Sequence, residues 1–220
     1  ALTVAGLLLW LNASWFEEYL TNSGRLGWYT DDVRNLIGFF AYENPGAFTN
    51  DYIGGYSRAQ SPFLHRWIMW AFAQFGLVRE ATQFGPPILL VLTSLMAGRA
   101  GYVLGRWPGA FITASLVLSS QVYAERVSGF LPRAVCFFGI YWFANGLLRS
   151  KPKHCAAAVI VMSAFYPTVA AVLGFGFAGW MLLVPKKMGL KLSAVSRWRM
   201  GVVTGAISIA LLIPTLIGLS

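Results

Sequence analysis

Apolar runs of roughly membrane-spanning length alternate with short polar segments along most of this chain. Clear runs cover residues 84–105, 107–123, 130–148 and 168–184, and the chain begins and ends inside others. A helix needs about 20 apolar residues to cross the roughly 30 Å hydrocarbon core of a bilayer. The pattern therefore predicts an all-α polytopic transmembrane bundle of about seven helices. We expect residues 1–220 to form a single transmembrane domain, and we expect it to be a fragment of a longer chain.

The longest polar stretch, residues 17–83, is predicted to be the first extracytoplasmic loop. Within it, 31–42 has an apolar face typical of a short helix, which the turn Asn44-Pro45-Gly46 should end. Residues 61–78 are long enough to span a membrane but contain His65, an arginine and a glutamine. An amphipathic helix lying at the membrane interface explains this mixture. A true span is the alternative, and it would invert every later loop.

The second half of the chain contains a short helical pair. The apolar run 155–166 has a predicted length of about 18 Å, too short to cross the bilayer alone. We therefore expect Tyr166-Pro167 to lie below the outer membrane surface, where a break in the helix is tolerated if it lines a cavity. Residues 124–133 form the predicted second extracytoplasmic loop.

Charge orients this arrangement. The two outer segments contain all the acidic residues: Glu17, Glu18, Asp31, Asp32, Glu43, Asp51, Glu80 and Glu125. The opposite loops contain all the lysines: Lys151, Lys153, Lys186, Lys187 and Lys191. The positive-inside rule places the lysine-containing loops in the cytoplasm. We expect an integral protein of the bacterial inner (plasma) membrane with its acidic loops extracytoplasmic.

Composition narrows the choice of partners. The chain is 57% hydrophobic and 11% charged, with a net charge of +9. The basic residues lie in short loops between apolar runs, which indicates contact with membrane lipid head groups and not with nucleic acid. The two cysteines, Cys136 and Cys155, lie in apolar runs without metal-ligand spacing, so we expect them to act as small buried apolar side chains.

Asp31-Asp32 is the first candidate for chemistry. A carboxylate just outside the membrane can act as a general base or bind a divalent cation. The same pair would also suit the N-terminus of a helix and have no chemical role.

A second candidate group lies around the other outer loop. Glu125 is followed by Arg126 and Arg133, and an arginine there could hold a phosphate in a bidentate fashion. Snorkelling of the arginines to head groups is the alternative. His65 and Tyr166 complete the candidate substrate-binding residues, although His65 could simply contact head groups and Tyr166-Pro167 could be an ordinary proline kink.

Three sequence features combine into a family resemblance. An Asp pair opens the long outer loop (TDDVRNLIGFF), the second outer loop ends in SGFLPRA, and a basic inner loop precedes an AFYPTVAAVLG hairpin. This pattern resembles the N-terminal module of the GT-C superfamily of integral-membrane glycosyltransferases, and of GT-C-like bacterial membrane proteins.

The resemblance implies a polyprenyl-phosphate sugar as donor and an acidic residue of the first outer loop as base. Asp31 or Asp32 would take that role, with Glu125 as the second-loop acid and Arg126 or Arg133 at the donor phosphate. The second loop lacks the fuller acidic motif of oligosaccharyltransferase-like members.

Two other functions remain open. The chain could be a non-catalytic subunit that packs against other membrane subunits, for example in an energy-transducing complex, because a fold does not fix a function. Its glycine-rich helices would permit such packing. A transporter is the third possibility, which the shortage of ionisable residues at mid-membrane depth disfavours.

Overall fold

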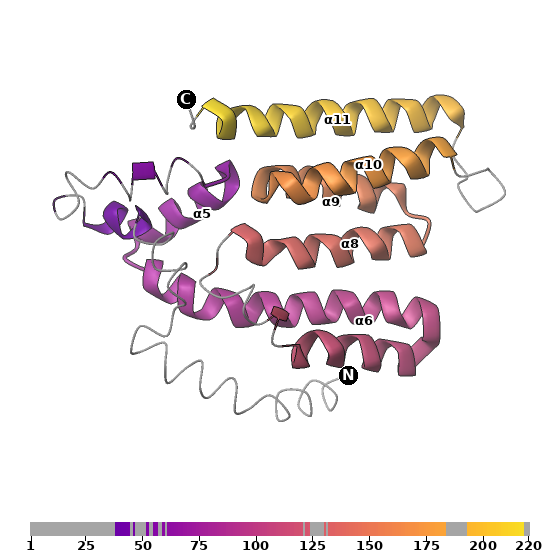
Figure 1. Ribbon diagram of the computed structural model, residues 1–220, viewed down its shortest axis with the longest axis horizontal. Coiled ribbons are helices and arrows are strands. Elements are labelled where there is room, and N and C mark those ends of the chain that lie inside the picture. The colour runs from indigo at the N-terminus through magenta and orange to yellow at the C-terminus, as the bar shows by residue number, and fades with distance from the viewer. Residues whose placement is uncertain are drawn as a thin grey trace.

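The structure of the chain is a computed structural model. It describes residues 61–120, 132–183 and 193–217, with 38–44 and isolated positions in 46–59, 122–123 and 130. Across these residues the regular structure is helical and contains no strand, which confirms the all-α prediction for the described part. Helices α6, α8, α9, α10 and α11 pack lengthwise, and α5 lies at one end of this bundle (Figure 1).

Helix α6 (Val78–Ser119) is a hairpin of two helical arms. Its helical geometry breaks at Gly105 (φ −137°, ψ 21°) and Arg106 (φ 56°, ψ −144°), and the chain turns back on itself there (Figure 1). The predicted separation into runs 84–105 and 107–123 is therefore confirmed as two arms. Their junction is a two-residue turn with a positive φ at a residue other than glycine, which is an uncommon conformation.

Small residues bring the two arms of α6 into close contact. A Cβ atom added at Gly101 would overlap the Thr113 hydroxyl and the Gly109 carbonyl. Small residues allow this close backbone approach, which is a common way for helices to pair inside a membrane, where the hydrophobic effect does not drive their association. Hydrogen bonds between the arms reinforce the pairing. The Thr113 hydroxyl donates to the Ala97 carbonyl at 3.0 Å, and the Ser94 hydroxyl donates to the Ala114 carbonyl at 3.1 Å.

Helices α8 (Cys136–Leu148) and α9 (Pro152–Phe165) form the centre of the bundle. A tight turn at Ser150 (φ 52°) joins them, and the Lys151 amide donates to the Gly146 carbonyl at 2.8 Å. The main core lies where α8, α9 and α10 (Pro167–Leu183) meet. Cys136 and Cys155 are both buried, as predicted.

Helix α5 (Phe63–Gln74) and the start of α6 pack together through Met69, Ala73 and Val78. The described helical residues 38–43 join this cluster and end at Asn44, where the sequence predicted a stop. The Glu43 carboxylate accepts a hydrogen bond from the Val78 amide at 2.8 Å, which satisfies one free N–H at the start of α6.

The helix that contains the first clear apolar run begins before that run. The run was predicted from residue 84, whereas α6 begins at Val78, and Pro86 and Pro87 lie inside it. The charged pair Arg79-Glu80 lies in the first turn of this helix, where the negative side chain of Glu80 is favourable because of the helix dipole.

The number of membrane spans is only partly supported. Among the described residues, two segments are long and apolar enough to cross a bilayer: Val78–Ser119 and Val195–Ile213, the latter within α11 (Ala194–Ile217). Helices α9 and α10 are apolar but have 14 and 17 residues. The predicted bundle of seven spans is therefore not confirmed.

Candidate functional site

The described candidate residues lie at or near one end of the bundle. Helix α5, which contains His65, lies at that end and contacts α9 and α11 (Figure 1). Arg133 lies in the short 3-10 helix η3 (Pro132–Val135) just before α8, and Tyr166 is the single residue between α9 and α10. Asp31, Asp32, Glu125 and Arg126 lie outside the described residues, so their roles stay predictions.

His65 is buried within this end of the bundle. Its side chain is 1% exposed, and Nε2 lies 2.8 Å from the Phe130 carbonyl, to which it donates when it carries the ring proton. The ring makes an edge contact with Phe39 at 5.3 Å between centroids. Burial lowers the pKa of His65 from 6.5 to about 4, and the hydrogen bond to Phe130 opposes part of that shift. A neutral histidine in this setting connects α5 to the residues that precede α8.

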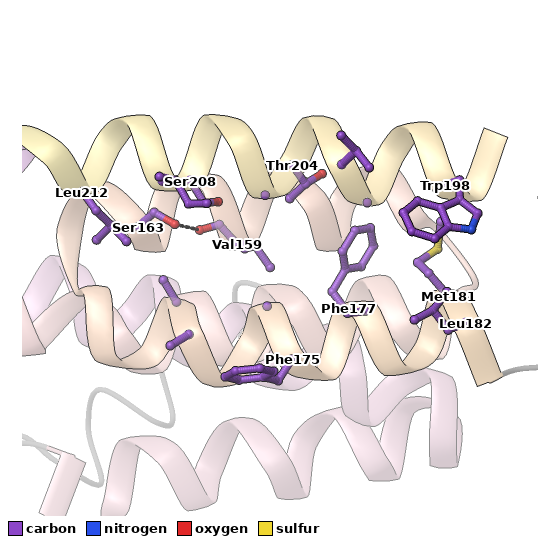
Figure 2. A pocket seen from close by; sticks show the side chains of 18 of the residues that line it. Val159, Ser163, Phe175, Phe177, Met181, Leu182, Trp198, Thr204, Ser208 and Leu212 are labelled. Atoms are coloured by element: carbon purple, nitrogen blue, oxygen red, sulfur yellow. Dashed lines mark hydrogen bonds between the residues drawn. The ribbon is translucent and has the colours of Figure 1, made fainter. Parts of the chain in front are cut away.

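An apolar groove of about 750 Å³ lies between α10 and α11, with α9 as its floor. Figure 2 shows Ser163 and Leu212 toward one end, and Met181 and Trp198 toward the other. Its volume is within the roughly 300–1,000 Å³ that is usual for ligand pockets. The sequence analysis did not predict this groove, although Gly201 and Gly205, one helical turn apart, leave open space along its wall.

Few polar groups line the groove. They are one charged side chain, Arg197, the indole N–H of Trp198, and the hydroxyls of Ser163, Thr204 and Ser208. The Ser163 hydroxyl donates to the Val159 carbonyl at 2.9 Å and is thereby occupied (Figure 2). No carboxylate or imidazole lines the groove among the described residues, so its wall is suited to binding an apolar chain and not to acid–base chemistry.

Neither His65, Arg133 nor Tyr166 lines the groove, but Pro167, the residue after Tyr166, does. One end of the groove therefore opens beside the joint between α9 and α10, at the end of the bundle where these three residues lie. Within the described part of the chain, no group of three or more His, Cys, Asp or Glu residues is placed to hold a metal.

Comparisons with protein-family models, curated proteins and solved structures gave no match. The function of the chain therefore has to be inferred from its own residues.

Proposed function

We propose that this chain is the membrane module of a GT-C-like glycosyltransferase. It would move a sugar from a polyprenyl-phosphate donor to an extracytoplasmic acceptor at the bacterial inner membrane. The single observation that favours this function is the apolar groove along α10 and α11, which is suited to hold the isoprenoid chain of the donor.

Exposed apolar side chains support a membrane setting for the groove. Large apolar residues are exposed on both arms of α6, on α10 and on α11. They include Leu95, Leu104, Ile112, Leu116, Val172, Phe175, Leu183, Trp198, Val202 and Ile209. An apolar surface of this extent is rarely left to water, and lipid tails would cover it. In that setting a lipid-linked donor diffuses sideways into the groove without leaving the bilayer.

The chemistry would occur at the end of the groove near Pro167. Asp31 or Asp32 would accept the proton of the acceptor nucleophile as that atom forms a bond to the anomeric carbon of the sugar. The bond from that carbon to the phosphate oxygen breaks, and polyprenyl phosphate leaves with the electron pair. Arg126 or Arg133 would stabilise the charge that develops on the departing phosphate.

The catalytic part is tested by the variants Asp31→Asn and Asp32→Asn, with Glu18→Gln as a control acid in the same predicted loop. Loss of a general base lowers the rate by about 10²–10⁴-fold. Transfer would be measured with a panel of polyprenyl-phosphate hexoses on the full chain in proteoliposomes. Unchanged transfer in both aspartate variants would remove them from the mechanism.

The lipid-binding part has a separate test. Gly205→Phe places a ring into open space in the groove, and Gly179→Phe adds the same ring on α10 at a position that also has open space but does not line the groove. Binding of undecaprenyl phosphate, measured by native mass spectrometry, should weaken roughly tenfold or more only for Gly205→Phe. Equal binding by the two variants would show that the chain of the lipid lies elsewhere.

A non-catalytic membrane subunit is the second candidate, and the exposure of α11 favours it. Only 6% of the candidate span Val195–Ile213 is buried within the chain, which leaves its apolar side open to another helix. Stoichiometric co-purification with a larger complex, together with no retention of undecaprenyl phosphate, would favour the subunit over the transferase.

A further inference from the structure

A second pocket, of about 230 Å³, lies at the opposite end of the bundle from α5. Its walls come from α6 and from the consecutive helices α8 and α9, which lie about 40 residues further along the chain. It is lined by Met96, Arg99, Phe138, Trp142, Asn145, Gly146, Arg149, Lys151 and His154. Basic side chains and aromatic rings therefore face one small volume.

The sequence contains no acidic residue after Glu125 that could neutralise the basic side chains of this pocket. Every acidic residue of the sequence precedes residue 126, whereas Arg149 and Lys151 both come after it. The described acids do not line the pocket, and Glu43 already caps α6. The first turn of α9 contains no acidic residue and has no side-chain cap, so its helix dipole adds to the positive potential.

Two buried polar atoms at the pocket lack partners. Asn145 is 6% exposed, and its Oδ1 atom makes no hydrogen bond in the described part of the chain. The Nε atom of Arg149 is also buried without a partner there. Buried polar groups are normally hydrogen-bonded, so a donor for Asn145 and an acceptor for Arg149 are both missing.

We propose that this pocket binds the head group of an anionic glycerophospholipid that carries a hydroxyl, such as phosphatidylglycerol. Arg99, Arg149 and Lys151 hold the phosphate, and a head-group hydroxyl donates to Asn145. The glycerol backbone and the first acyl carbons lie against Phe138 and Trp142. Basic pockets between membrane helices on the cytoplasmic side are suited to such head groups.

The assignment depends on the membrane setting of the chain but not on its being a transferase. The anionic phospholipid is held through its phosphate in the basic pocket, whereas the polyprenyl-phosphate donor of the proposed function lies in the apolar groove that ends near Pro167. The two proposals can therefore fail separately.

The test uses the full chain in detergent, titrated with dioleoyl-phosphatidylglycerol, dioleoyl-phosphatidylcholine or dioleoyl-phosphatidic acid and followed by native mass spectrometry. Phosphatidylglycerol should bind at least tenfold more tightly than phosphatidylcholine. Lys151→Gln should weaken it several-fold, and the double variant Arg99→Gln/Lys151→Gln roughly tenfold or more. Both residues are exposed, so these variants should fold.

Lys153→Gln is the matched control, because Lys153 is an exposed lysine two residues from Lys151 that does not line the pocket. It should change binding less than twofold. Equal losses for Lys151→Gln and Lys153→Gln would overturn the site in favour of general surface charge.

The near-isosteric variant Asn145→Leu tests the hydroxyl contact. It should abolish the preference for phosphatidylglycerol over phosphatidic acid, and a retained preference would overturn the role of Asn145. Displacement of bound phosphatidylglycerol by millimolar inorganic phosphate would overturn the lipid as ligand, because it would show that free phosphate alone satisfies the site.

Discussion

The contact between the arms of α6 makes Gly101→Ala the sharpest test of the fold. The added methyl group would overlap the Gly109 backbone carbonyl, which cannot rotate away as a flexible side chain would, and the Thr113 hydroxyl. The arms must separate, and Thr113 is displaced from its bond to the Ala97 carbonyl. Overpacking of this kind costs about 1–3 kcal/mol of the free energy of unfolding.

A Gly→Ala change inside a helix also stabilises the helix by up to about 1 kcal/mol, because alanine has the higher helix propensity. A control variant is needed to separate this gain from the overpacking cost. Gly179→Ala in α10 provides that control, because a Cβ atom there meets nothing within 4 Å. We expect Gly101→Ala to be less stable than Gly179→Ala by about 1–3 kcal/mol, the overpacking cost alone.

Thermal unfolding of the two variants in detergent, followed by circular dichroism, measures this difference. One kcal/mol shifts Tm by about 2–4 °C in a chain of this size. If Gly101→Ala melts at the same temperature as Gly179→Ala, or above it, the arms of α6 do not meet at Gly101 and Gly109.

Two further predictions concern the end of the bundle near α5. His65 has a pKa of about 4 when folded, below its ordinary 6.5, so the unfolded chain binds more protons between these values and stability falls as pH drops from 6.5 to 4. The loss is on the order of 3 kcal/mol. Tm measured against pH should fall less steeply for His65→Gln than for the exposed control His154→Gln, and parallel slopes would contradict the assignment. Glu43→Ala should destabilise the chain by about 0.5–2 kcal/mol, because the Val78 amide loses its cap. A denaturant titration against the unsubstituted chain measures this, and an unchanged midpoint would show that the cap contributes nothing.

Local features of the sequence were sufficient to predict several breaks between helices. Gly105-Arg106 separates two apolar runs, and Tyr166-Pro167 separates two others, because proline cannot donate the helical hydrogen bond. Both breaks are present in the structure. The six residues by which α6 precedes the apolar run could not be recognised as helical, because charged residues in the first turn of a helix resemble a loop in sequence.

Contacts between distant segments could not be read from the sequence. The groove requires that α10 and α11 present their glycine-lined sides to each other, and the basic pocket requires Arg99 on α6 to lie beside Arg149. Periodicity indicates which residues share one helix face, but not which face of another helix it meets. The predicted catalytic residues Asp31 and Asp32 lie outside the described part, so their placement stays a prediction.

The single residue between α9 and α10 has a mechanical consequence. With only Tyr166 between them, and with their sides packed together, these two helices form a close hairpin. Ten residues separate the end of α10 at Leu183 from the start of α11 at Ala194. Because α11 contacts both α9 and α10, any widening of the groove between α10 and α11 requires α11 to give up contacts with this hairpin.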